Sequence, residues 1–327
     1  MNKKETLTKE VSLKFSFYTF ICIFIVVLFH SDFRYFYPII EDLTPVSTSY
    51  FFCVSAFFFY RGLNNDNITL RLKRRCKTLL LPYLIWNLIY MIPYIIFYKV
   101  PFSSIVRGFT INPFCTPSWY LLTLFLFFLL APFVKHVLAS KYLTLALLTA
   151  IVITSYLGYV KFQQELALVP FVGGYLIRMA EYITPFLLGA IIGTYFSNQI
   201  YVTWKNGVIG ILCSGAIIFL LFYPIPPAMR WFLWVILPIT LWKSIPEKIF
   251  NISTFTQYLT APSFIINMTH CYLLGLYKPL LAQTKAFTEK RLTALTVLCA
   301  IITAYALYYL LKKVLPKTLN ALTGSRI

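Results

Sequence analysis

Two histidines lie within long apolar runs, where an ionisable side chain is unexpected. His30 ends the run FICIFIVVLFH, and His270 lies within TAPSFIINMTHCYLLGLY. A histidine can accept a proton as a general base near neutral pH, because its unperturbed pKa is about 6.5. Ionisable groups at membrane depth are costly and indicate a functional site that faces a bundle interior or a water-filled cavity. The alternative is an interfacial histidine that marks a helix end, and the sequence alone does not separate the two.

Apolar runs like these recur along the whole chain and predict an all-α integral membrane protein. Of its 327 residues, 59% are hydrophobic and only 12% are charged, whereas soluble domains carry about a quarter charged residues. Helices of roughly 17–25 apolar residues cross a bilayer because they satisfy their backbone hydrogen bonds internally. We expect a bundle of about ten transmembrane helices, near residues 15–36, 46–60, 79–98, 117–134, 142–160, 172–196, 207–223, 230–242, 257–279 and 293–311.

The basic residues predict how these helices are oriented. With the N-terminus inside, most of the 29 lysines and arginines fall in cytoplasmic segments, as is typical of membrane proteins. We therefore expect both termini to be cytoplasmic, with a tail at residues 1–14, a transmembrane domain at 15–311 and a basic tail at 312–327. The residues Lys285, Lys290 and Arg291 fall outside in this topology, against the rule.

The net charge and the cysteines exclude some classes of partner. The net charge of +19 is explained by topology and contact with membrane lipids, so we expect no nucleic-acid partner. The seven cysteines are scattered singly, without a C-x-x-C pair. This spacing indicates neither a metal site nor a disulfide framework.

The expected helices place the two histidines at comparable depth. At a rise of about 1.5 Å per residue, His30 lies about 24 Å along its helix from Lys14, in the outer half. His270 falls in the outer half of the ninth helix if that helix begins near Gln257. The third histidine, His136, is predicted to be an interface residue.

A basic segment, RLKRRCKTLLLPYLIWN, leads into the third expected helix. Arg71, Arg74 and Arg75 fall on one helical face, and Lys77 follows. One interpretation is an anchor that rests on anionic lipid headgroups. The other is a docking surface for a phosphorylated cytosolic cofactor, because guanidinium groups match phosphate geometry. The spacing favours the lipid anchor, and the two interpretations are compatible.

Two glycines in ITPFLLGAIIG have the spacing of a close helix contact. Gly189 and Gly193 are one helical turn apart. Small residues at this spacing allow two helix backbones to approach each other closely. We therefore expect helix packing at this point of the chain and no chemistry.

Several segments, taken in order, resemble the bacterial membrane acyltransferase-3 family. The first expected helix ends in IVVLFHS and is followed by FFCVSAFFFYRG, which is similar to the family's F-f-x-S-G-y-f. The basic segment then runs into P-Y-l-x-W, and PSWYLLTLF is similar to l-W-F-l-x-x-L. Late in the chain, ITPFLLGAIIG and SFIINMTHCYL are similar to F-x-x-G-a and s-f-x-i-Y-l-x-H. The resemblance covers roughly residues 15–280.

This resemblance implies an enzyme of the bacterial cytoplasmic membrane that transfers an acyl group, usually acetyl. The implied donor is a cytosolic acyl-CoA such as acetyl-CoA. The implied acceptor is a sugar hydroxyl of a surface glycan, such as a capsule or exopolysaccharide, or of its lipid-linked precursor. The basic segment matches the family's segment at the cytosolic mouth, so its residues are the expected donor-binding residues: Arg71, Arg74, Arg75 and Lys77.

The same resemblance implies roles for both histidines. His30 matches the first-helix histidine, the family's best candidate catalytic residue, and we expect it to act as the base. His270 matches the late histidine and is expected to position the acceptor or to stabilise developing charge. No G-x-S-x-G motif is present, so direct transfer is simpler than a serine acyl-enzyme, while a transient acyl-enzyme stays open.

Two alternatives remain at this point. Ten helices with buried histidines also fit a transporter or flippase-like permease for a lipid-linked glycan or small solute, although no internal duplication typical of transporters is visible. The ordered motifs favour the enzyme. The second alternative is a catalytically silent member of the family, because Thr19 stands where many members carry an arginine.

Overall fold

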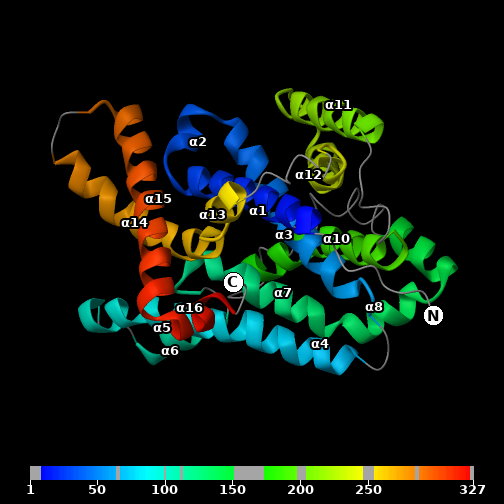
Figure 1. Ribbon diagram of the computed structural model, residues 1–327, viewed down its shortest axis with the longest axis horizontal. Helices are drawn as coiled ribbons and strands as arrows, with labels where there is room; N and C mark the ends of the chain where they lie inside the picture. Colours follow the sequence, from blue (N-terminus) through cyan, green and yellow to red (C-terminus); the bar gives the residue numbers. More distant parts are fainter. Residues whose placement is uncertain are drawn as a thin grey trace. The chain divides into compact units, whose positions relative to one another are not determined.

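The computed structural model describes residues 9–63, 67–98, 101–110, 113–150, 173–196, 204–245, 254–283 and 287–324 (Figure 1). These residues form helices and connecting segments without a strand, which confirms the all-α class for the part of the chain described. A further short apolar helix occupies Lys141–Ala150. In chain order the other helical elements are α1 (Lys9–His30), α2 (Phe33–Phe36), α3 (Ile39–Tyr60), α4 (Ile68–Arg75), η1 (Cys76–Leu80), α5 (Leu81–Tyr98), α6 (Phe102–Thr110), η2 (Thr116–Ser118), α7 (Trp119–Leu129), α8 (Ala131–Leu138), α10 (Gly173–Tyr195), α11 (Trp204–Leu221), α12 (Pro227–Trp242), α13 (Thr254–Thr260), α14 (Ser263–Ala282), α15 (Glu289–Val314) and α16 (Pro316–Thr323).

Four of the described helices are long and apolar enough to cross a membrane. They are Val11–His30, Ile39–Tyr60, Ile68–Ile96 and Glu289–Val314. The bent pair Thr116–Leu129 and Ala131–Leu138 can serve as a fifth span. Most of the span expected at 142–160 lies outside the described residues. The number ten and the orientation of the termini therefore stay predictions.

The helix that carries His270 begins later than the sequence suggested. The expected ninth span divides into α13 and α14, with Ala261 and Pro262 in the turn between them. Proline has no N–H to continue a helix and disfavours helical backbone at the residue before it. His270 is therefore the eighth residue of α14, in the first half of that helix, rather than far along a helix begun near Gln257.

The chain divides into two compact units, which are described separately. The first unit comprises Met1–Ile25, Glu41–Ile68 and Leu130–Thr260. Its core joins α1 to α3 and α12. The ring centroid of Phe15 lies 5.9 Å from that of Phe57 and 5.4 Å from that of Trp242. The Tyr50 hydroxyl donates a hydrogen bond of 2.9 Å to the Phe15 carbonyl, so the polar end of this buried ring is satisfied.

The glycine pair in α10 confirms the predicted close packing of helices. A Cβ atom at Gly189 would lie 2.0 Å from the carbonyl oxygen of Cys53, and one at Gly193 would lie 2.6 Å from that of Phe57. Both neighbours are backbone atoms of α3, which cannot rotate away as a side chain would. Only glycine at these two positions allows α10 and α3 to approach this closely.

The second unit comprises Val26–Ile40, Thr69–Leu129 and Ala261–Ile327. Within it, α14 and α15 pack side by side (Figure 1), and α16 packs against α5. The Trp86 indole N–H donates a hydrogen bond of 3.0 Å to the Leu322 carbonyl. Gly324, with a φ of 65°, approaches the Thr78 carbonyl so closely that a Cβ would lie 2.4 Å from its oxygen. The segment expected as a basic tail thus contains a packed helix, and its cytoplasmic location stays a prediction.

We expect Gly189→Ala to destabilise the first unit. The added methyl group meets the Cys53 carbonyl, so α10 must move away from α3. This overpacking should cost roughly 1–3 kcal/mol, measured as a lower midpoint of thermal unfolding in detergent. Gly215→Ala is the matched control, because a Cβ there meets nothing within 4 Å. Equal midpoints for the two variants would contradict the assigned contact.

Candidate functional site

The second unit brings together the two histidines that the sequence analysis selected. His30 is the last residue of α1 and is exposed, whereas His270 in α14 is only 1% exposed. Their ring centroids lie 5.1 Å apart with an interplanar angle of 46°. The spacing of 240 residues between them gave no sign of this contact. Two imidazoles at one place can divide the tasks of proton transfer and positioning.

A backbone carbonyl fixes the tautomer of His270. Its Nδ1 lies 2.8 Å from the carbonyl oxygen of Asn267 and 3.3 Å from that of Ile266. A carbonyl oxygen only accepts hydrogen bonds, so Nδ1 must carry the hydrogen. In the neutral ring the lone pair is therefore on Nε2. This Nε2 atom lies 3.3 Å from the Sγ atom of Cys271.

A pocket of about 320 Å³ opens beside His30 and Cys271. The turn after α1 supplies one wall, α14 a second and α15 a third. Thr293 and Thr296 on α15 donate their hydroxyl hydrogens to carbonyls of their own helix, so their oxygens can accept hydrogen bonds from a bound molecule. The lining residues are His30, Ser31, Asp32, Cys271, Leu274, Gly275, Lys278, Thr293 and Thr296.

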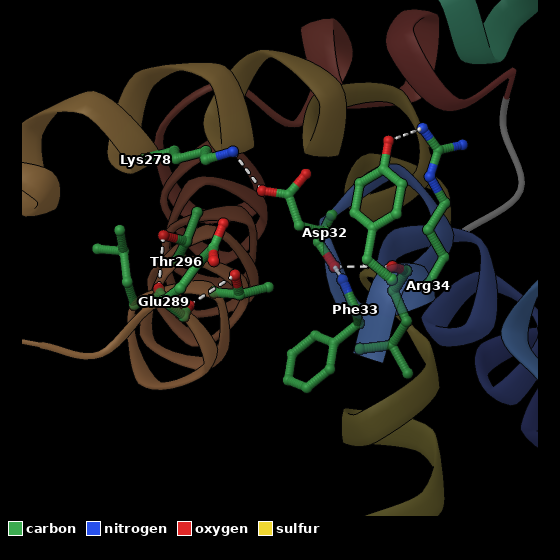
Figure 2. Close-up of polar contacts among 11 residues, drawn as sticks. Asp32, Phe33, Arg34, Lys278, Glu289 and Thr296 are labelled. Carbon is green, nitrogen blue, oxygen red and sulfur yellow. Dashed lines mark hydrogen bonds and ion pairs between the residues drawn. The ribbon is translucent and has the colours of Figure 1, made fainter. Parts of the chain in front are cut away.

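An ion pair joins two walls of this pocket. The Lys278 ammonium group on α14 donates to the Asp32 carboxylate in the turn after α1 (Figure 2). Arg34, two residues further on, contacts Phe29 and Tyr35 instead of this ion pair. Its guanidinium carbon lies 5.0 Å from the Phe29 ring centroid, and its Nη2 donates 3.0 Å to the Tyr35 hydroxyl. Asp32 and Lys278 therefore supply the charge of the pocket.

Contacts from α5 and from the segment before η2 hold the turn of α14 that carries His270. The Tyr90 hydroxyl donates 2.7 Å to the Met268 carbonyl, and the Cys115 thiol lies 3.6 Å from the same oxygen. Both side chains come from segments far from α14 in the sequence. They hold α14 in place at Met268, two residues before His270.

A buried amide connects these contacts. The Asn87 Nδ2 donates 2.8 Å to the Tyr83 carbonyl and 2.9 Å to the Ser118 hydroxyl. Its Oδ1 accepts a hydrogen bond of 3.2 Å from the Cys115 N–H. Asn87, Ser118 and Cys115 are fully buried. We call these three residues the Asn87 network.

The predicted donor-binding residues lie on α4 and η1. Arg74 and Lys77 are exposed, whereas Arg71 and Arg75 are half-buried. The guanidinium carbon of Arg75 lies 4.8 Å from the Phe128 ring centroid. The described lining of the pocket at His30 comes from other elements. The structure thus forms the expected helical basic segment but does not bring it into this pocket.

Three side chains at the site are potential metal ligands. The ring nitrogens of His30 and His270 and the Sγ of Cys271 lie within 4.8 Å of one another. Imidazole and thiolate are ligands that Zn²⁺ accepts. No metal site was expected from the sequence because its cysteines are scattered singly, whereas these three donors come from two helices, α1 and α14. The expectation that the chain holds no metal stays a prediction.

The comparison with protein families matches residues 20–313 to the acyltransferase-3 model, described as an acyltransferase domain. The chain belongs to the acyltransferase-3 family. The comparisons with curated proteins and with solved structures each gave no match. The acyltransferase-3 match includes both histidines, and together with the long apolar helices it supports a multi-pass membrane acyltransferase.

Several residues of the site were not predicted from the sequence. Cys271 directly follows His270 but was not selected as a site residue, because a lone cysteine carries no spacing signal. Lys278 was missed because its partner Asp32 is distant in the sequence. Asn87 had a usable signal, as an uncharged polar residue within the apolar stretch that follows the basic segment.

We expect Asn87→Leu to destabilise the unit that carries the site. The substitution removes the partner of the Ser118 hydroxyl and of the Cys115 N–H. Each buried group left without a partner costs about 1–3 kcal/mol, so thermal unfolding in detergent should occur at a clearly lower temperature. Leu88→Ala, at a neighbouring position that is 46% exposed, is the control and should unfold near the wild-type temperature. An unchanged midpoint for Asn87→Leu would show that the network does not stabilise the fold.

Proposed function

We propose that this chain is a membrane O-acyltransferase, in the simplest case an O-acetyltransferase. It moves an acyl group from a cytosolic acyl-CoA to a sugar hydroxyl of a capsule, exopolysaccharide or other envelope glycan, or of its lipid-linked precursor. The observation that carries the proposal is the His30–His270 pair beside a pocket that also holds the Asp32–Lys278 ion pair, in a chain of an acyltransferase family. We place the protein in the bacterial cytoplasmic membrane, with about ten spans and both termini cytoplasmic.

His30 is the proposed base for the acceptor. A sugar hydroxyl becomes a nucleophile when a neutral imidazole removes its proton during attack. His30 is exposed and lines the pocket, so a sugar can reach it. His270 is buried and its Nε2 faces Cys271, so it does not take the proton of the acceptor.

Lys278 is the proposed electrostatic partner of the reaction. Attack on a thioester carbonyl places negative charge on the carbonyl oxygen, and a fixed cation stabilises that charge. The Lys278 ammonium lines the pocket and is oriented by Asp32. Because this cation is held before substrate arrives, little reorganisation is needed at the transition state.

The basic segment is the proposed site of the donor's phosphates. Acyl-CoA carries several phosphate oxygens, and arginine and lysine are the side chains that bind such groups. Arg74 and Lys77 are exposed and available for this contact. With threonine at position 19 in place of the frequent arginine, the basic segment takes over the attraction of the donor.

Replacing His30 tests the proposed function directly. We expect deletion of the gene to remove acyl esters from the host's purified surface polysaccharide, as measured by NMR. The intact gene should restore them. With His30→Ala, the restored ester content should be lower than with the intact gene by a factor of about 10² or more. His270→Ala should lower the ester content by a smaller factor. His136→Ala is the control, because His136 is an exposed residue of α8.

Membrane levels of each variant are compared by immunoblot in the same strains. If the polysaccharide is equally acylated in the deletion strain and in the restored strain, acylation of that polymer is not the task of this protein. If His270→Ala is the more damaging substitution, the roles of the two histidines are wrongly assigned.

Donor affinity should depend on the exposed part of the basic segment. We expect the double variant Arg74→Ala/Lys77→Ala to raise the KM for acyl-CoA roughly three- to tenfold while kcat is retained, measured with purified protein. These two positions are preferable to Arg75, which packs over Phe128. The control Lys313→Ala/Lys317→Ala removes two exposed charges near the C-terminal end. An unchanged KM in the first variant would reduce the basic segment to a lipid anchor.

A further inference from the structure

Cys271 lies in contact with an imidazole that can act as a base. Its Sγ lies 3.3 Å from Nε2 of His270, the nitrogen that holds the lone pair. The opposite nitrogen, Nδ1, donates to the Asn267 carbonyl. A nucleophile, a base beside it and a group that orients the base are the arrangement of covalent catalysis.

Cys271, His270 and His30 differ in their exposure to the pocket, and this difference indicates different roles. Cys271 is half-buried and lines the pocket, and His270 is buried next to it. His30 lines the same pocket. A molecule in the pocket can therefore reach the sulfur and the His30 ring, while the fold protects the base that serves the sulfur.

We propose that Cys271 accepts the acyl group from the donor thioester and passes it to the sugar hydroxyl. This inference rests on the proposed function and assigns a covalent intermediate to it. The donor class is an acyl thioester, and the intermediate is an S-acyl cysteine. His270 is the base of the first step, and His30 is the base of the second.

The first step exchanges one thioester for another. The Cys271 Sγ attacks the acyl carbonyl carbon, and its proton moves to Nε2 of His270. The bond between that carbon and the coenzyme sulfur breaks, and the departing thiolate takes the proton from His270 and leaves as the free thiol. Apolar surroundings disfavour a separated charge pair, so the proton moves during the attack and the resting pair is neutral.

The second step forms the oxygen ester. The sugar hydroxyl attacks the S-acyl carbon, and its proton moves to His30. The carbon–Sγ bond then breaks, and the Cys271 sulfur recovers a proton from the His30 imidazolium. No oxidant, reductant or further reactant is required.

The size of the pocket favours this two-step route. A volume of about 320 Å³ is at the low end for a site that holds one small organic ligand. Direct transfer requires the thioester arm of the donor and the sugar to be present together. With the acyl group held on Cys271, donor and acceptor can use the same pocket in turn.

The test is acylation of the full-length protein in the absence of acceptor. Purified protein in detergent is mixed with radiolabelled acetyl-CoA, quenched in acid and analysed by peptide mass spectrometry. We expect one acetyl group on Cys271 that neutral hydroxylamine removes and that added acceptor glycan chases into ester. Cys271→Ala should abolish the adduct and lower transfer to the glycan by about 10²-fold or more.

Two further variants keep the test decisive. Cys299→Ala, at another half-buried cysteine in the same unit, should retain the adduct on Cys271 and the transfer. Cys271→Ser keeps the size of the side chain and should accumulate an acyl ester that resists neutral hydroxylamine and transfers slowly. This second variant answers the question if the alanine variant does not fold.

The failure of this inference is distinguishable from failure of the proposed function. Transfer to glycan at the wild-type rate by Cys271→Ala, or a label on another residue, overturns the intermediate and leaves the function standing. Absence of transfer by wild-type protein, together with unaltered glycan in the deletion strain, overturns the function itself. A bound metal found by elemental analysis, lost in Cys271→Ala and accompanied by no S-acyl adduct, overturns the inference by making Cys271 a ligand.

Discussion

The constraint on which the rest of this structure depends is that polar groups removed from water need partners inside the protein. In an apolar environment an unsatisfied N–H or carbonyl costs several kcal/mol. The backbone meets this constraint by forming helices throughout the described residues. Buried side chains of the second unit meet it through specific bonds, of which the Asn87 network and the bond from His270 to the Asn267 carbonyl are the most consequential.

The hydrogen bonds that buried polar groups need for folding also position the side chains of the site. Asn87 is held by Tyr83 and Ser118, and it holds the Cys115 N–H in turn. Cys115 and Tyr90 then contact the carbonyl of Met268, which fixes the turn of α14 before His270. Because the same histidine must satisfy its own Nδ1–H, its lone pair is directed toward Cys271. The orientation of the reactive groups thus follows from hydrogen bonds that the fold requires in any case.

The sequence predicted the helical class and the location of several helices, and it singled out the two histidines that the structure brings together, because each leaves a local signal. Apolar runs and breaks locate helices such as α3 and α15, and the Gly189–Gly193 spacing indicated the packing that the structure shows. The division at Pro262 was missed because hydropathy alone continues across it. The pairing of Asp32 with Lys278 and the approach of His30 to His270 could not be predicted, because they depend on how distant helices pack and one sequence carries no record of such contacts.

The proposed S-acyl intermediate also bears on Thr19, which stands where the resemblance leads us to expect an arginine. An enzyme that transfers directly must hold donor and acceptor together for as long as the reaction takes, so weak donor binding lowers its rate at every turnover. A covalent intermediate changes this requirement, since the donor needs to remain only until its acyl group has moved to the protein. Threonine at position 19 and a proposed donor-binding segment that lies outside the described pocket lining are then compatible with turnover. The cysteine beside His270 supplies the step that makes a brief encounter with the donor sufficient.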